Sequence, residues 1–393
     1  MPTRPPRMRP LLLAVGLLPI GLAAAELGVR AADSYVGGSL SRPPCPAASA
    51  VPCPVARHAL PAFGTVAAAD PDTGEPRTLL LNSLGLRGND VAVPKPDGVR
   101  RVLLLGDETP FAAGVPDGET FAGLLTPALT AAAERAEPGA TAEVVNAAIP
   151  CDCPLLSVLR LRTLGALQPD LILLCVRPSD LSEDAAYRRD LLTDADGRAV
   201  ACPHPAVAAG KPRASTPTLD SWRDSLALRL AVRTFLGPER CPLTGAPLIA
   251  AVDPVAGGPA AALAAEQALT PFAELARVAE GLGARAAVIV LPDRLEAGRN
   301  GAATSDDEPN AEPSPVVRMI LDAASAAGLR TFHAAAALTG PSGAGETGPS
   351  MTSGGELTRA GHVRLAEALA GFLLSAPRSE PSTSASASAA AGG

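Results

Sequence analysis

The sequence predicts a three-layer α/β sandwich, with a parallel five-stranded sheet covered by helices on both faces. Short apolar runs alternate with longer helical stretches from about residue 76 onward, as in parallel sheets. The apolar runs show almost no polar alternation, which is typical of strands buried on both faces. Hydrophobic residues make up 47% of the chain and charged residues 19%, so a wholly disordered chain is excluded.

The elements follow from these runs. The five strand candidates are residues 101–105, 143–147, 171–176, 286–291 and 329–333. Helices are predicted at residues 119–135, 155–167, 219–236, 269–282, 315–327 and 361–374. In the second of these helices, leucines recur at near-helical spacing from Leu155 to Leu164, and Pro169 follows its end.

Both ends of the chain differ in composition from this core. Three arginines (Arg4, Arg7 and Arg9) precede an uncharged apolar run over residues 10–25, the pattern of an export signal. Residues 1–30 are therefore expected to form a signal anchor or a cleaved signal peptide. Residues 31–75 are expected to be a Pro/Ala-rich linker or wrapping segment, residues 76–375 the folded domain, and residues 376–393 a disordered tail. The protein is thus expected on the extracytoplasmic side, held by an N-terminal membrane helix, or secreted if that helix is cleaved.

Charge and cysteine content narrow the function classes. The net charge of −7 argues against a nucleic-acid partner. Seven cysteines suit an oxidising compartment, with Cys45–Cys53 and Cys202–Cys241 as candidate disulfides. Cys151 and Cys153 are too close in sequence to pair easily, and Cys175 lies in an apolar strand as an expected buried thiol. No cofactor and no zinc site is expected, because the cysteine spacings match no zinc template.

Sites in open parallel sheets form at the carboxyl ends of strands. Residues 106–110 follow the first strand candidate, 146–152 the second and 177–180 the third, while 353–362 precede the final helix. These four loops are expected to meet at one edge of the sheet.

Several stretches within residues 82–374 resemble, in order, the SGNH/GDSL hydrolase family, in its membrane-anchored bacterial branch. They are residues 82–88, 100–115, 183–197, 219–236 and 361–369. The resemblance implies a flavodoxin-like three-layer fold. It also implies an esterase whose serine attacks an ester carbonyl, with a histidine as base, an aspartate that orients the histidine, and an oxyanion hole.

The positions that match those motifs carry other residues. Glu108 stands at the serine position, Cys151 at that of an oxyanion glycine, and Ser179 at that of an oxyanion asparagine. Glu356 falls at the histidine position, and Ser353 or Gly354 at the aspartate position. Gly106, Asp107 and Asp180 remain, with Asp107 and Asp180 expected to shape and support the loops. His362 follows Gly361 and is therefore expected on the final helix, outside the loop of the base.

Three interpretations of this substituted site are open. The site has drifted and function has moved to binding; or Glu108 and Glu356 face each other as an acid/base pair, one with a raised pKa; or Glu108, Glu356 and Asp180 hold Ca²⁺ or Mg²⁺. The leading expectation is a pseudoenzyme that binds an acylated carbohydrate or a protein partner at the cell envelope. The alternative is a divergent ester hydrolase or acyl-transfer enzyme with a Glu-based site, acting on acylated carbohydrate or lipid.

The remaining histidines and the single tryptophan receive structural interpretations. His58 and His204 lie in proline-rich stretches and are expected to face solvent. His333 ends a strand candidate, and Trp222 lies on a predicted helix as a packing residue.

Overall fold

The computed structural model describes residues 50–204, 207, 258–292, 313–339, 349–352 and 355–375, together with a few positions between 21 and 29. The predicted helix at 219–236, the predicted disordered tail, Ser353 and most of the predicted membrane segment lie outside these residues. Among the described residues, no helix is both long and apolar enough to cross a bilayer. Cys45 and Cys241 are also outside them, so neither candidate disulfide can be followed, and within the described residues Cys53 and Cys202 form no disulfide.

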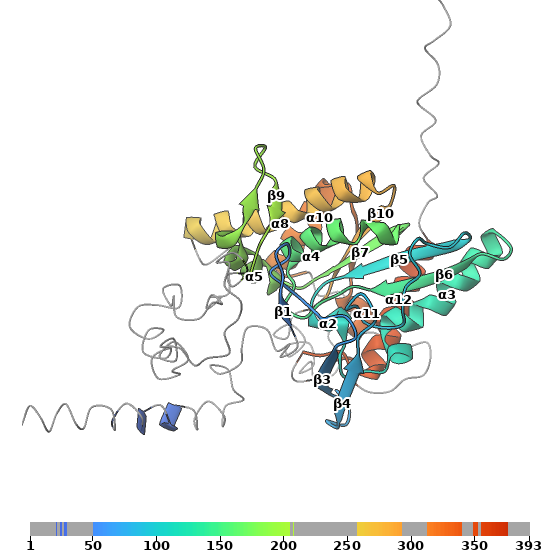
Figure 1. The fold of residues 1–393 in the computed structure, drawn as a ribbon, viewed down its shortest axis with the longest axis horizontal. Helices are drawn as coiled ribbons and strands as arrows, with labels where there is room; N and C mark the ends of the chain where they lie inside the picture. The colour runs from blue at the N-terminus through green and yellow to red at the C-terminus, as the bar shows by residue number, and fades with distance from the viewer. Residues whose placement is uncertain are drawn as a thin grey trace, which may run out of the picture.

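A parallel five-stranded sheet forms the centre of the fold (Figure 1). Its strand order is β11-β10-β7-β5-β6. The strands are β5 (Val99–Leu105), β6 (Thr141–Asn146), β7 (Leu171–Val176), β10 (Arg285–Val290) and β11 (Arg330–His333). This order is that of the flavodoxin-like doubly wound sheet, and the five strands lie where the apolar runs predict them. The predicted α/β class and parallel sheet are confirmed.

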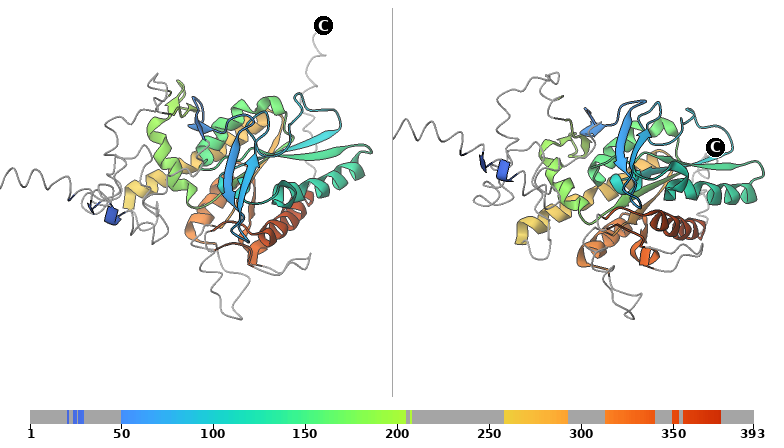
Figure 2. Two further views of the ribbon diagram at one scale, coloured as in Figure 1. Left: turned by 60° about the horizontal axis from the view of Figure 1, so that its bottom comes forward. Right: turned by 90° about the horizontal axis from the view of Figure 1, so that it is seen from below.

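Alternate residues of the strands feed two separate cores, which makes the domain three-layered. Leu103 and Leu174 face a core shared with helices α4 (Pro154–Thr163), α8 (Gly258–Gly281) and α10 (Pro315–Ala326). Leu104 and Leu173 face the opposite core, shared with α3 (Phe121–Ala136) and α12 (Arg359–Leu374). The two views of Figure 2 show these helices on the two faces of the sheet. The central strands are therefore buried on both faces, as their uninterrupted apolar runs predict.

The remaining short helices of the described chain lie at the carboxyl edge of the sheet, except η2 (Gly165–Leu167), which precedes β7 at the amino edge. They are α2 (Glu108–Phe111), η1 (Asp117–Glu119), η2, α5 (Asp180–Tyr187), η3 (Arg188–Asp190) and α11 (Ala335–Thr339). A hairpin of β8 (Leu192–Thr193) and β9 (Ala199–Ala201) follows η3. The predicted helix at 269–282 begins earlier, at Gly258, because the alanine-rich stretch before Pro271 is a strong helix former.

Part of the segment expected as a linker or wrapping segment is folded against the domain. Strands β1 (Val51–Pro52) and β2 (His58–Ala59) form one antiparallel pair. Strands β3 (Thr65–Ala69) and β4 (Pro76–Leu80) form a longer hairpin. The buried residues Leu60, Val66 and Leu81 pack with Phe111 of α2 and Ile149 of the β6–α4 loop. From residue 50 onward the described chain therefore wraps the site edge of the sheet.

Candidate functional site

The first loop of the site places Glu108 directly above the end of β5. Gly106 has φ 140°, and a Cβ there would lie 2.9 Å from the carbonyl oxygen of Cys175, so the turn requires glycine. Asp107 caps α2, because its Oδ1 accepts a hydrogen bond from the N–H of Thr109 at 3.0 Å. Helix α2 then begins with Glu108, whose side chain is 40% exposed. Glu108 is thus the residue of this loop that a solute can reach.

The second loop places a backbone donor beside Glu108. The N–H of Ile149 donates to the carbonyl oxygen of Gly106 at 2.9 Å, so the β6–α4 loop runs alongside the first loop. Cys151 adopts a left-handed backbone with φ 67°, a conformation that favours glycine. Its N–H points to Oε2 of Glu108 at 3.5 Å. The Cys151 side chain itself is buried.

The third loop supplies a cation that the sequence analysis gave no role. Arg177 follows β7, and its side chain is only 12% exposed. Its guanidinium forms ion pairs with both Glu108 and Asp107, and its Nε lies 3.8 Å from Oδ1 of Asp180. Asp180 in turn accepts a hydrogen bond from the N–H of Arg177 through Oδ2, at 2.9 Å. We call these four residues, Asp107, Glu108, Arg177 and Asp180, the Arg177 cluster.

Burial and charge set the protonation of the Arg177 cluster. Burial raises the pKa of Asp107 to about 7; Arg177 opposes this shift and Glu108 adds to it. Burial, followed by the charge of Asp107, raises the pKa of Asp180 well above its usual range. Burial also pushes upward on Glu108, but Arg177 outweighs it and lowers the pKa of that carboxyl. Near neutral pH the cluster therefore holds one Glu108–Arg177 ion pair beside carboxyls that retain protons readily.

The fourth loop carries Glu356, which makes no described contact with the Glu108–Arg177 ion pair. Glu356 is exposed, and its backbone closes a turn with Thr352: the N–H of Thr352 donates to the carbonyl oxygen of Glu356 at 2.8 Å. The described contacts join Glu108 to Arg177 and to the N–H of Cys151, and none joins it to Glu356. In the site, the carboxyl groups whose pKa is raised are those of Asp107 and Asp180.

No metal cluster forms from the described residues. They contain no group of three His, Cys, Asp or Glu side chains placed to hold an ion, and Arg177 already supplies positive charge to Glu108, Asp107 and Asp180. Ser179 precedes α5 with a buried hydroxyl that has no hydrogen-bond partner among the described residues. The structure thus brings Asp107, Glu108, Cys151 and Asp180 together, whereas Ser353 is outside the described residues.

The expectation that His58 faces solvent is wrong. His58 is buried, and its Nε2 donates to the carbonyl oxygen of Pro150 at 2.9 Å and lies 3.4 Å from Oδ1 of Asp152. Arg160 donates to both oxygens of Asp152 at 2.8 Å and to the carbonyl oxygen of His58 at 3.0 Å. Burial lowers the pKa of His58, although Asp152 opposes that shift. We call His58, Asp152 and Arg160 the Arg160 cluster; it fixes the loop that presents Cys151.

His362 lies on α12, as expected. Its ring is fully buried and stacked on Phe121, with ring centroids 5.8 Å apart. Its Nδ1 accepts a hydrogen bond from the N–H of Phe121 at 3.2 Å. Burial, with a contribution from Arg87, lowers the pKa of His362 to about 3. A ring held neutral in this packed position serves the core between α3 and α12.

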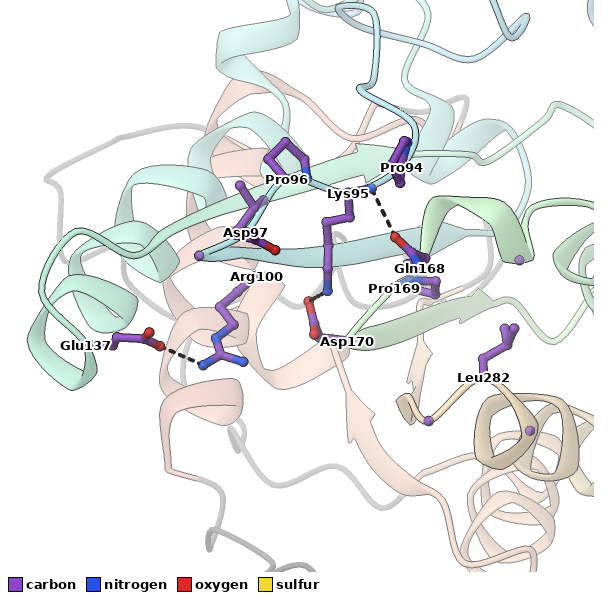
Figure 3. A pocket seen from close by; sticks show the side chains of 15 residues that line it. Pro94, Lys95, Pro96, Asp97, Arg100, Glu137, Gln168, Pro169, Asp170 and Leu282 are labelled. Atoms are coloured by element: carbon purple, nitrogen blue, oxygen red, sulfur yellow. Dashed lines mark hydrogen bonds and ion pairs between the residues drawn. The ribbon is translucent and has the colours of Figure 1, made fainter.

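A separate groove of about 820 Å³ lies at the opposite end of the sheet (Figure 3). Its charged side chains bind one another: Lys95 contacts Asp170 at 2.6 Å, and Arg100 contacts Glu137 at 3.0 Å. The amino ends of strands rarely carry the chemistry of such sheets, which gathers at the carboxyl ends. The groove therefore does not extend the site described above.

The fold and the site define a class: a doubly wound α/β domain with a buried Arg–carboxylate cluster at the carboxyl ends of its strands. No protein-family model and no curated protein matches the sequence.

Solved structures with some likeness include TesA (16% identity, TM-score 0.35, covering 70% of this chain and 97% of that one). Others are the psychrotrophic esterase EstA from Pseudoalteromonas sp. (11%, TM-score 0.34, 70% and 96%) and the lipase/acylhydrolase from Enterococcus faecalis (13%, TM-score 0.34, 70% and 95%). At these TM-scores and identities the likeness transfers no activity to this chain.

Proposed function

We propose that this chain is an exported pseudoenzyme of SGNH/GDSL ancestry, which has lost serine esterase activity and binds a partner at the cell envelope. The observation that carries the proposal is the state of Glu108. Its carboxylate is ion-paired with Arg177 and lies 3.5 Å from the N–H of Cys151. An anion of the protein itself thus lies against a backbone donor that would otherwise stabilise the oxyanion of a reacting ester.

The magnitudes support loss of the ancestral chemistry. Removing one oxyanion donor lowers the rate by about 10²–10³, and removing a nucleophile or base abolishes most of an effect of about 10⁶. Glu108 replaces the hydroxyl, the exposed Glu356 replaces the imidazole, and His362 is held neutral in the core. Each replacement alone is severe, and together they argue against an acyl-serine intermediate at this site.

The location and the ligand of this proposal rest on the sequence. Arg4, Arg7 and Arg9 before the apolar run of residues 10–25 support export with the domain outside the cytoplasm. Resistance of the full chain to alkaline carbonate extraction, with an intact N-terminus by mass spectrometry, is the expected result for a signal anchor. The resemblance to an esterase family supports an acylated carbohydrate as ligand, with a protein partner as the other choice.

One observation favours a second candidate, a divergent ester hydrolase or acyl-transfer enzyme with a Glu-based site. The side chain of Glu108 is 40% exposed and ionised, so a substrate can approach it, and the proton-retaining Asp107 lies next to it. In that case Glu108 would accept a proton from an attacking water molecule, as a positioned carboxylate does in general base catalysis.

The test uses the full chain with Glu108→Ala and Glu108→Ser variants. A fluorophosphonate probe, which labels activated serines, is expected to leave all three unlabelled, while a serine esterase in the same assay is labelled. Hydrolysis of short-chain aryl esters is expected to stay at the uncatalysed rate in all three. Serine labelling of the natural chain, or a measurable activity that Glu108→Ala abolishes, would overturn the pseudoenzyme proposal.

A further inference from the structure

The β3–β4 hairpin has an exposed outer face without a single charge. The register pairs Thr65 with Leu80, Ala67 with Thr78 and Ala69 with Pro76, and directly opposed residues share one face. All six of these side chains are exposed. The hairpin lies beside α2 (Figure 1), and at its tip the buried Asp70 is bound to Arg359 of α12. A sheet face this free of charge is unusual for a surface that meets only water.

Large apolar side chains gather at the base of this hairpin. Phe63 is 71% exposed, Leu80 is 68% exposed and Leu84 is 44% exposed. All three lie around Asn82: the N–H of Phe63 donates to the carbonyl oxygen of Asn82 at 2.9 Å, and the N–H of Leu84 donates to its Oδ1 at 2.9 Å. We call Phe63, Leu80 and Leu84 the hairpin patch. Clustered exposed apolar residues of this kind mark interaction surfaces.

The backbone at Phe63 adds a second sign of function. Phe63 has φ 54°, a left-handed conformation that is unfavourable for a bulky residue. The strain places an aromatic ring in solvent, where it gains no packing within the fold. Strained residues of this kind persist where they serve binding.

The N-terminal part of the chain joins the fold beside the hairpin patch. Ala50, the first residue of the continuously described chain, packs against the buried cluster that contains Leu60 and Leu81, under the base of the hairpin. Residues 26–49, which separate the apolar run of residues 10–25 from Ala50, therefore lead to this point. A tether raises the effective concentration of a weak surface for its target into the millimolar range.

We propose that the hairpin patch docks on the lipid surface to which the N-terminal segment holds the domain. The inference rests on the membrane attachment included in the proposed function. Phe63, Leu80 and Leu84 would enter the boundary between headgroups and acyl chains, where apolar side chains of peripheral proteins insert. At the hairpin tip Arg77 and Arg359 are paired with Asp70 and Asp72, so attraction to anionic lipid is expected to add little to the contact.

The experiment measures the depth of a tryptophan in a bilayer. The full chain is reconstituted with phosphatidylcholine vesicles in a Trp222→Phe background, because Trp222 is the only tryptophan. Phe63→Trp reports on the hairpin patch, and Leu192→Trp is the matched control, since Leu192 is 52% exposed on the β8–β9 hairpin. Brominated lipid is expected to quench Phe63→Trp at least about twofold more than Leu192→Trp, with little change between low and high salt.

Equal quenching at the two positions would overturn the docking surface, and a partner protein or a second copy would then be the occupant of the hairpin patch. Hydrogen exchange of the unsubstituted full chain gives an independent measurement that no variant can disturb. Residues 60–86 are expected to be protected at least about twofold when vesicles are added, and unchanged exchange would contradict the proposal. Release of the chain by carbonate would refute the anchor alone, because quenching and exchange by added vesicles still report on the hairpin patch.

Discussion

The Arg160 cluster and the Arg177 cluster lie on neighbouring loops and are built differently. Arg160 binds a single carboxylate. It donates two hydrogen bonds of 2.8 Å to Asp152 and a third to the carbonyl oxygen of His58. Arg177 is shared among three carboxylates. Within the described residues, Oδ2 of Asp107 and Oδ1 of Asp180 accept no hydrogen bond of good geometry. In the Arg160 cluster one cation meets one carboxylate, whereas in the Arg177 cluster one cation meets three carboxyl groups.

This difference distinguishes a structural cluster, built on Arg160, from the candidate functional cluster, built on Arg177. A buried ion pair whose atoms are all bonded fixes the chain around it, and here it fixes the loop of Cys151. A cluster with surplus carboxyl groups keeps protons instead, which is the perturbation expected of sites that act or once acted on ligands. The opening of Glu108 to solvent belongs with the second cluster, because the Arg160 cluster is buried throughout.

The largest effect is expected from breaking the Arg160 cluster. Asp152→Ala leaves the buried Arg160 without its partner, which costs about 3–5 kcal/mol in the free energy of unfolding. Chemical denaturation of the full chain measures it. The control is Asp196→Ala, whose partner Arg198 is 51% exposed, with an expected cost below about 1 kcal/mol. Similar small losses for both variants would show that the Arg160 cluster does not hold the loop.

The sheet was predictable because strands buried on both faces leave uninterrupted apolar runs, as in Leu171–Val176. The β3–β4 hairpin was less visible. Its alternation is carried by alanines and threonines, and Val66 is its only large buried side chain, so the period-two pattern is weak. Elements made of small residues give little contrast between the inner and the outer face.

The location of the candidate site could be predicted from the sequence, but its side-chain contacts could not. Topology alone brings residues 106–110, 146–152 and 177–180 to one edge. The pairing of Glu108 with Arg177 spans 69 positions, and that of His58 with Pro150 spans 92. Such contacts depend on side-chain direction, which spacing in one sequence does not encode. A basic residue directly after a buried strand, beside several acidic residues, was the one signal that pointed to Arg177.

A smaller effect should appear when the surplus acid is removed. The folded pKa of Asp107 is about 7 against an ordinary 3.8, so the folded state binds the extra proton between these values. The stability that Asp107 contributes is present below about pH 4 and is lost as the pH rises through about 7. Asp107→Asn, which retains the helix cap, is expected to gain stability relative to the natural chain across this window, by up to about 4 kcal/mol for a shift of about 3 pKa units.

Denaturation curves of both proteins between pH 4 and pH 8 measure this gain, with Asp196→Asn as the exposed control. A difference that stays constant with pH would mean that Asp107 is ionised throughout as a partner of Arg177. The Arg177 cluster would then be as fully paired as the Arg160 cluster, and the contrast between the two would disappear.

The smallest effect is expected at Glu356, an exposed residue of the loop before α12. Its described bonds are made by its backbone to Thr352, so Glu356→Gln should change the free energy of unfolding by less than about 0.5 kcal/mol. It should also leave the pH dependence of the natural chain unchanged, because Arg177 and not Glu356 is the charge paired with Glu108. The same denaturation series measures both. If Glu356→Gln instead flattened the pH dependence as Asp107→Asn does, Glu356 would be coupled to the Arg177 cluster, and two facing carboxylates would again be the best account of the site.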